Sequence, residues 1–209
     1  MIVGRSRIWR ALFVVGGVLY LGGSAQHPRG TMAEMMAAPA WVPGHTTVFA
    51  GLLVLTLGLV LFRRTVRASA SMDRWLRFSI VATALEAVEM AVHTVAYVDV
   101  DALTHGHATP VLTSHLWLAT AIYPLFAVSL IGLIWHGQRE GSLGSSWIAW
   151  IGMLGAVAHG IVMWLVYIFE VFWAPILFPV AAILLSLWFV LAGVWPSKMR
   201  DAQPIVLSQ

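Results

Sequence analysis

The sequence predicts an all-α membrane protein, a polytopic bundle of six transmembrane helices with both termini in the cytoplasm. Three observations support this prediction. Of the 209 residues, 60% are hydrophobic and only 10% are charged, whereas a soluble domain carries about 25% charged residues. The apolar residues gather into six runs, each close to the roughly 20 residues that cross a bilayer. The basic residues stand almost entirely in alternate connections between these runs.

The six runs form a single transmembrane domain, and each is bounded by charge, Gly, Pro or Ser. The predicted spans cover residues 8–25, 44–62, 76–98, 114–135, 147–169 and 175–195. Only Glu170–Ala174 separates the last two spans, which predicts a tight helical hairpin. In the longest connection, residues 26–43, Thr31–Ala38 is predicted to form a short amphipathic helix on the membrane surface. We expect Pro39 and Pro43 to end it.

The charge of the connections predicts the orientation. Loops that remain in the cytoplasm are enriched in Lys and Arg. Of the twelve Lys and Arg, all except Arg29 fall on one predicted side. They are Arg5, Arg7, Arg10, Arg63, Arg64, Arg67, Arg74, Arg77, Arg139, Lys198 and Arg200. This side is therefore predicted to be cytoplasmic, in a multi-pass protein of the cell's inner (plasma) membrane.

The first span allows a second interpretation. Its basic start, short apolar stretch and small residues Gly23 and Ala25 are also typical of a cleaved signal peptide. In that case the mature protein would have five spans and an N-terminus outside.

Composition excludes several kinds of site and partner. The chain has no cysteine, which rules out disulfides, thiolate nucleophiles and Cys-based zinc or iron–sulfur centres. Its pI is near 9.8 with a net charge of only +3, and the basic residues stand in membrane-flanking loops. We therefore predict the lipid bilayer, and no nucleic acid, as the partner of this surface.

The third span carries an unusual polar face. At about 100° per residue, Glu86, Glu89 and His93 fall within a sector of about 60°, with Tyr97 beside them. Ionisable groups inside a membrane span are expensive, so each indicates a functional site. No Lys or Arg lies deep in any span. The two carboxylates must therefore be protonated, hydrogen-bonded to His or bound to a cation.

Three further histidines extend this polar track. His45 and His115 open the second and fourth spans near the outer interface, and His159 lies at the middle of the fifth, on nearly the same face as Glu170. From the helical rise, His93 should lie roughly 8–9 Å below the outer interface, and Glu89 and His159 roughly 15 Å. The outer loops add His27, Asp99, Asp101, His105 and His107, whereas only His136 falls on the cytoplasmic side.

This asymmetry predicts a site that opens to the outer face. Imidazole and carboxylate together are the usual ligands of Zn, Fe, Mn or Cu, which makes Glu89, His93 and His159 candidate metal ligands. Glu86 and Glu89 are candidate catalytic acids or bases. His45 and His115 are candidate cofactor-binding residues at the entrance. Pairs of His on facing helices also suit the axial positions of haem b.

Three functions remain open from the sequence. The first is a transition-metal- or haem-binding enzyme or redox protein that acts on a hydrophobic small molecule or lipid. The second is a proton- or cation-coupled transporter, although the polar track ends at mid-membrane. The third is an accessory subunit of a membrane complex, with small-residue faces packed against partner helices; a homo-oligomer is also compatible with such faces.

One segment carries a resemblance. His27-Pro28, followed by Trp41-Val42-Pro43-Gly44-His45, resembles uncharacterised small six-span bacterial integral membrane proteins. These proteins have a His-Pro after the first helix and a Trp-x-x-x-His that opens the second. The resemblance covers the first two spans and implies a six-helix topology and a bacterial source. It implies no activity and does not extend to Glu86, Glu89 and His93.

Overall fold

The computed structural model describes residues 8–66 and 68–196. These ranges are helical and contain no strand, and six helices are long and apolar enough to cross a membrane. The prediction of an all-α bundle with six spans is confirmed. The long helices are α1 (Ile8–Ala25), α3 (Trp41–Thr65), α4 (Ala70–Val95), α6 (Pro110–Arg139), α7 (Ser146–Met163) and α8 (Leu177–Val194).

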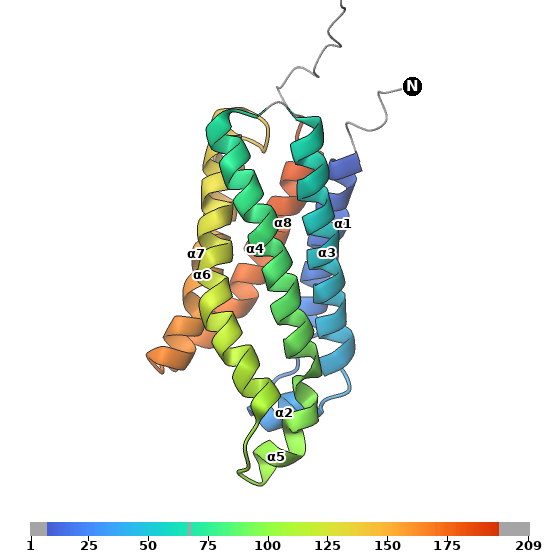
Figure 1. Ribbon diagram of the computed structural model, residues 1–209, viewed down its shortest axis with the longest axis vertical. Coiled ribbons are helices and arrows are strands. Elements are labelled where there is room, and N and C mark those ends of the chain that lie inside the picture. The colour runs from blue at the N-terminus through green and yellow to red at the C-terminus, as the bar shows by residue number, and fades with distance from the viewer. Residues whose placement is uncertain (1–7, 67, 197–209) are drawn as a thin grey trace, which may run out of the picture.

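Short elements complete the connections. The helices α2 (Met32–Ala37) and α5 (Val100–Thr104) lie together at one end of the bundle (Figure 1). A 3-10 turn, η2 (Ala96–Asp99), joins α4 to α5. A π-helical turn, η3 (Trp164–Ile168), ends α7, and a 3-10 turn, η4 (Ala174–Ile176), precedes α8. We call the end that carries α2 and α5 the capped end, and the opposite end the chain-end side.

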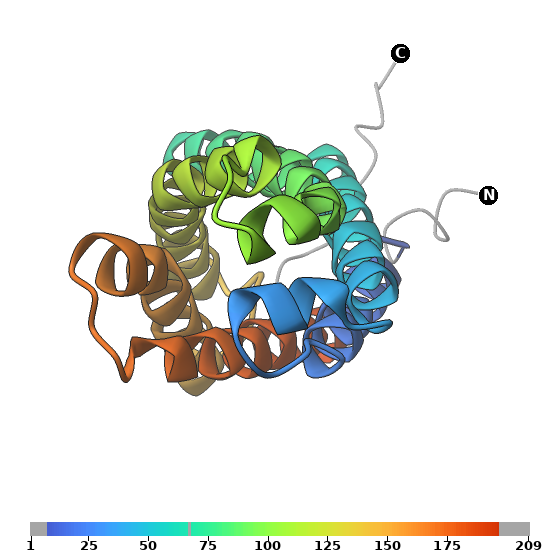
Figure 2. The same ribbon diagram turned by 90° about the horizontal axis from the view of Figure 1, so that it is seen from below.

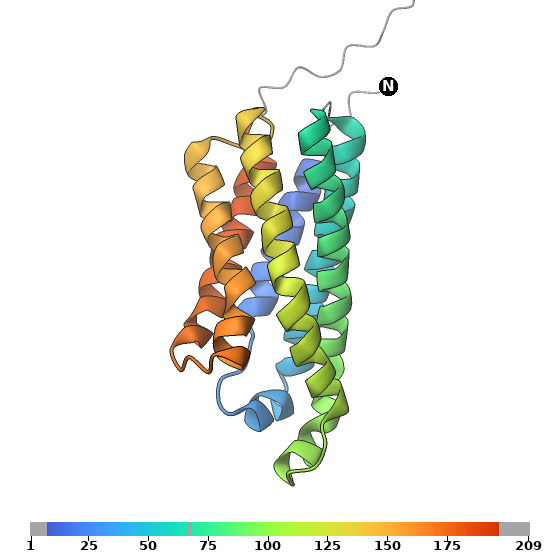
Figure 3. The same ribbon diagram turned by 60° about the vertical axis from the view of Figure 1, so that its left-hand side comes forward.

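The six long helices form a closed ring in chain order. Each packs against the next one along the chain, and α8 packs back against α1. Figure 2 shows this ring from the capped end, with α2 and α5 lying across it. The side view in Figure 3 shows that α4 and α6 reach further towards the capped end than the α7–α8 hairpin does. Within this ring, α4 packs against α3 on one side and α6 on the other, and a third face of the helix points inward.

Small residues allow α1 and α3 to pack closely. A Cβ atom added at Gly23 would lie 2.6 Å from the Gly44 carbonyl oxygen, and one added at Gly51 would lie 3.0 Å from the Gly16 carbonyl oxygen. Small residues let membrane helices approach until their backbones touch, which replaces the hydrophobic driving force that lipid removes. α1 is therefore an integral member of the ring in this structure.

The ring interior differs between its two ends. Large aromatic side chains of one buried cluster fill the chain-end side, and five of them pack edge to face or tilted against one another: Trp9, Phe13, Phe62, Trp188 and Phe189. Phe126 belongs to the same cluster. The polar side chains lie towards the capped end, where Met36 of α2 packs with Trp41, Ala96 and Leu112. We call the first group the aromatic plug.

The outer surface of the ring is apolar, as contact with lipid requires. Large hydrophobic side chains such as Val88, Trp150 and Leu154 are 57%, 60% and 56% exposed. A patch of this extent on a water-soluble protein would aggregate. The chain is therefore a multi-pass membrane protein.

The structure extends or corrects several predicted boundaries. α6 begins at Pro110, four residues before the predicted start. Pro43 does not end the surface helix but lies in the first turn of α3, where a missing N–H costs nothing. The described ends lie on the same side, since Arg10 donates a hydrogen bond to the Trp195 carbonyl oxygen. Arg5, Arg7, Arg67, Lys198 and Arg200 lie outside the described residues, and the cytoplasmic orientation remains a prediction from charge.

Candidate metal centre

The polar face of α4 points into the ring. Glu86 and Glu89 are 0% exposed, and both stand on the inward side of a helix whose neighbours are α3 and α6. Burying an ionisable group without compensation costs several kcal/mol. Each carboxylate must therefore have a specific partner, and each has an imidazole.

Glu89 pairs with His115 of α6, whose Nδ1 atom lies within hydrogen-bond distance of Glu89 Oε1. The start of α6 brings His115 to this depth. Asp99 Oδ2 accepts hydrogen bonds from the backbone N–H groups of Val111 and Leu112, at 2.7 and 2.8 Å. A carboxylate at this position satisfies helix-terminal donors and fixes where the helix begins.

Glu86 pairs with His159 of α7, and the Glu86 Oε1 to His159 Nε2 distance is 2.8 Å. The imidazole stacks on the ring of Tyr123, with centroids 4.1 Å apart, and meets the edge of Phe126 at 5.3 Å. Sequence reasoning grouped His159 with Glu89 and His93. The structure instead brings it to Glu86, one turn of α4 further from the capped end.

His93 stands at the centre of a group of histidines. Its ring centroid lies 3.8 Å from that of His115, 4.3 Å from that of His45 and 6.4 Å from that of His27. Trp41 covers this group, with its ring 4.2 Å from His45 and 4.8 Å from His93. Four elements thus contribute to one cluster: the connection after α1, and helices α3, α4 and α6.

Backbone carbonyls fix two of these imidazoles. His45 Nδ1 lies 2.7 Å from the Trp41 carbonyl oxygen, and His27 Nδ1 lies 2.8 Å from the Pro28 carbonyl oxygen. A carbonyl only accepts, so each Nδ1 must carry the hydrogen, which leaves the lone pair of each ring on Nε2. Metal-binding histidines are typically held in this way.

Several polar atoms of the cluster are buried and have no hydrogen-bond partner among the described residues. They are His45 Nε2, His93 Nδ1, His93 Nε2, Glu86 Oε2 and Glu89 Oε2. A buried polar atom without a partner costs about 1–3 kcal/mol, and most such atoms in folded proteins are satisfied. Their concentration around His93 therefore points to a ligand that binds there.

Two groups of side chains have the spacing of a metal site. One is Glu89, His93 and His115; the other is His27, His45 and His93. Within each group the ligand atoms all lie within 4.8 Å of one another. Ligand atoms about 2.0–2.1 Å from a tetrahedral zinc are about 3.4 Å apart. Side-chain rotations that move the ligand atoms by about 1 Å would therefore complete either site.

The pairs His93–His115 and His45–His93 do not fit haem as axial ligands. Axial imidazoles lie on opposite faces of the porphyrin with the macrocycle between them. The rings of His93 and His115 are only 3.8 Å apart, and those of His45 and His93 are 4.3 Å apart and nearly parallel. Such rings are already in van der Waals contact and leave no room for a macrocycle.

Other predicted polar groups lie outside the cluster. Tyr97 is 44% exposed, because α4 has given way to the 3-10 turn η2 before it. Glu170 is exposed and has a φ of 52°, since the π-helical turn ends α7 and shifts the helical face. His105 and His107 are exposed at the capped end, where His105 approaches Asp101 at 3.3 Å.

Sequence reasoning missed the roles of His27, Trp41, Asp99 and Tyr123. The first two belong to the segment that carries the His-Pro and Trp-x-x-x-His pattern, so this pattern marks residues that meet His93. Asp99 and Tyr123 carry no such signal, because their contacts depend on how α6 packs.

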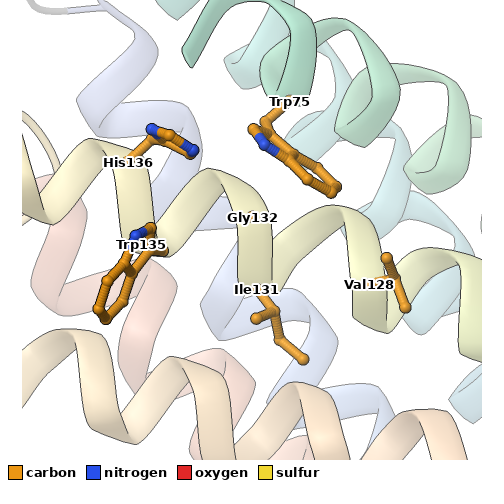
Figure 4. Close-up of a pocket in the computed structure, with 6 residues that line it drawn as sticks. All are labelled: Trp75, Val128, Ile131, Gly132, Trp135 and His136. Carbon is orange, nitrogen blue, oxygen red and sulfur yellow. The ribbon is translucent and has the colours of Figure 1, made fainter. Parts of the chain in front are cut away.

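A separate pocket of about 320 Å³ lies between α4 and α6, on the chain-end side of the cluster (Figure 4). It is lined by Trp75, Val128, Ile131, Gly132, Trp135 and His136. Trp75 lies over Gly132, where an added Cβ would come within 2.2 Å of the indole. Among these lining residues, His136 alone has a side chain that commonly binds metals. One such side chain does not make a metal site.

Comparisons of this chain with protein-family models, curated proteins and solved structures find no match. The assignment of function therefore depends on the geometry alone.

Proposed function

We propose that this protein is a membrane-embedded metal enzyme in which Glu89, His93 and His115 hold a divalent transition metal. The observation that carries the proposal is the grouping of their ligand atoms within 4.8 Å, together with the unpartnered nitrogens of His93 and the unpartnered Oε2 of Glu89. A bound metal would satisfy Oε2 of Glu89 and one nitrogen of His93, and no hydrogen-bond donor or acceptor among the described residues does so.

The ligand set suits catalysis better than structural binding. Structural zinc sites use four protein ligands, whereas catalytic ones use three and keep a position open for water or substrate. Two histidines with one carboxylate form such a set for Zn²⁺, and also for Fe²⁺. A metal held by these residues would lower the pKa of a bound water molecule and supply a nucleophile near neutral pH.

The second buried pair supplies a proton acceptor. Glu86 lies one helical turn from Glu89 on the same face of α4 and is hydrogen-bonded to His159. With a metal held at Glu89, this pair would be placed to accept a proton from a water molecule at the site and to return it to the leaving group of a substrate. Glu86 and Glu89 thus have different roles: proton transfer and metal binding.

The surroundings favour an apolar substrate. The cluster lies inside a helix ring whose outer surface is hydrophobic, and Trp41, Met36 and Leu112 cover its capped end. A water-soluble substrate would have to leave its hydration shell to reach Glu89. A hydrophobic small molecule or a lipid pays less for this transfer. We place the protein in the plasma membrane, with the capped end outside, from the charge of the loops.

Metal content tests the proposal. Protein extracted in mild detergent should retain at least one equivalent of a transition metal per chain. Glu89→Gln and His115→Gln should each lose an ion because each removes a ligand. His107→Gln changes an exposed loop histidine and is the matched control. Metal-free wild-type protein that also fails to bind added Zn²⁺ would refute the proposal and favour an accessory role.

Proton or cation transport is the second candidate. The Glu86–His159 pair favours transport because this pair extends the polar track further from the capped end. The aromatic plug opposes it, since the track then meets Phe126 and the other buried rings of the plug. Proteoliposomes loaded with a pH-sensitive dye would distinguish the two. Metal-dependent enzymes leave the internal pH unchanged, whereas a transporter collapses an imposed gradient and Glu86→Gln abolishes this flux.

A further inference from the structure

We infer that the cluster holds two metal ions, and that His93 bridges them as an imidazolate. The second ion is bound by His27, His45 and His93, on the capped-end side of the ion at Glu89, His93 and His115. This inference rests on the proposed function, because the two sites share His93.

The outer ligands are prepared for metal binding. The Nδ1 atoms of His27 and His45 each donate to a backbone carbonyl, so the lone pair of each ring is on Nε2. The Nε2 atom of His45 is buried and has no partner among the described residues. One ligand atom from each of His27, His45 and His93 lies within 4.8 Å of the other two.

His93 supplies the argument for a bridge. Both of its ring nitrogens are buried without a hydrogen-bond partner in the described part of the chain. A single ion would satisfy one nitrogen and leave the other unpaired. Two ions satisfy both nitrogens of His93, together with Nε2 of His45 and Oε2 of Glu89.

The bridge has a defined chemistry. A neutral imidazole carries one N–H hydrogen, so the second ion displaces that proton, which leaves to the solvent. The imidazolate then donates one lone pair to each metal. With metal–nitrogen bonds of about 2.0–2.1 Å, an imidazole places the two ions about 6 Å apart. This separation exceeds the about 3.5–4 Å of centres in which two metals clamp one oxygen-transfer reaction.

The two proposed sites differ in how far their ligands are exposed. His27 is the exposed member of the cluster, whereas His45 and His115 are 4% exposed. Trp41 packs on the rings of His45 and His93 and donates a hydrogen bond from Nε1 to the Thr94 carbonyl oxygen at 3.2 Å. An ion would therefore pass His27 first, and the inner ion is the more enclosed.

Stoichiometry with Zn²⁺ tests the inference. Wild-type protein stripped of metal and dialysed against Zn²⁺ should bind two equivalents, measured by mass spectrometry of the metal. His27→Gln and His45→Gln should each leave one equivalent at the inner site. Glu89→Gln and His115→Gln should leave one at the outer site, and His93→Gln should lose both. His107→Gln should still bind two.

The other outcomes are distinguishable. One equivalent in the wild type, lost in the Glu89, His93 and His115 variants but kept in the His27 and His45 variants, would refute the second ion and leave the proposed function standing. One equivalent kept in the Glu89 and His115 variants but lost in the His27 and His45 variants would refute both. His27 is exposed, so its variant should fold even if His93→Gln does not.

A second measurement addresses the bridge itself. Protein loaded with two equivalents of Cu²⁺ should show the loss of electron paramagnetic resonance intensity expected of two spins coupled through an imidazolate. His27→Gln, with one Cu²⁺, should show the full signal of an isolated ion. Two independent, uncoupled signals in the wild type would refute the bridge.

Discussion

The buried pair of Glu86 and His159 provides the most direct test of how the ring interior is held together. His159→Phe keeps the ring stack on Tyr123 but removes the partner of Glu86. The side chains of the pair are only 6% and 1% exposed, so water cannot replace the lost nitrogen. The variant therefore leaves a carboxylate buried without its imidazole.

The expected cost follows from the geometry. A protonated His159 would attract the Glu86 carboxylate, 2.8 Å away, by about 6 kcal/mol at an effective dielectric constant of about 20. Desolvation offsets part of this attraction, and removing one partner of a buried pair typically costs about 3–5 kcal/mol. Replacing both partners, in Glu86→Leu with His159→Phe, removes the uncompensated charge. The double variant should therefore be more stable than His159→Phe alone.

The assay is the free energy of unfolding in mixed micelles, measured for the wild type, both single variants and the double variant. We expect a coupling energy of about 2–3 kcal/mol, at the upper end of the range for contacting residues. His105→Phe, in the exposed pair with Asp101, is the control and should change stability little. A loss below about 1 kcal/mol in His159→Phe, the size of an ordinary neutral hydrogen bond, would refute the ion-pair reasoning.

Three other predictions concern packing, protonation and topology. Gly23→Ala should destabilise the protein by about 1–3 kcal/mol in the same assay, because the new methyl group would lie 2.6 Å from the Gly44 oxygen; Gly22→Ala, with open space around it, should not. The N–H and hydroxyl groups of Thr31 donate to the Glu34 carboxylate. The backbone hydrogen bond is the main cause of the lowered pKa of Glu34. This contribution to α2 is present above the unfolded pKa of about 4.3 and is lost as pH falls through the lower folded value; an NMR titration in which Thr31→Pro, which removes both donors, leaves the Glu34 pKa unchanged would contradict it. A reporter fused to the C-terminal end should read cytoplasmic, and a signal from the opposite side would reverse the assigned orientation.

Hydropathy and helical periodicity predicted much of this architecture. The predicted ends of the six spans lie within six residues of the ends of the long helices, because a bilayer imposes a length on each helix and charge marks its ends. The inward face of α4 was also predictable, since Glu86, Glu89 and His93 share one sector and lipid would exclude them. These properties belong to single helices and need no knowledge of packing.

The pairing across helices could not be predicted in the same way. His115 was expected at the outer interface because Ser114 opens the apolar run, but α6 begins at Pro110. His115 is thus about 7–8 Å inside its helix, and Glu89 is about 9 Å inside the end of α4 at Val95. This matching depth brings the two side chains together. It depends on the helix start that Asp99 fixes, and no periodicity within a span reveals it.

The closed ring in chain order bears on how the protein is made. Each helix meets its neighbour as soon as the ribosome delivers it, except that α1 must wait for α8 before the circle is complete. Biosynthesis therefore passes through open arcs of helices. Glu89 enters the membrane one long helix ahead of His115, and Glu86 enters two ahead of His159. During that interval each carboxylate lacks its imidazole partner, so it must be protonated or bound by another group while α4 is in the membrane.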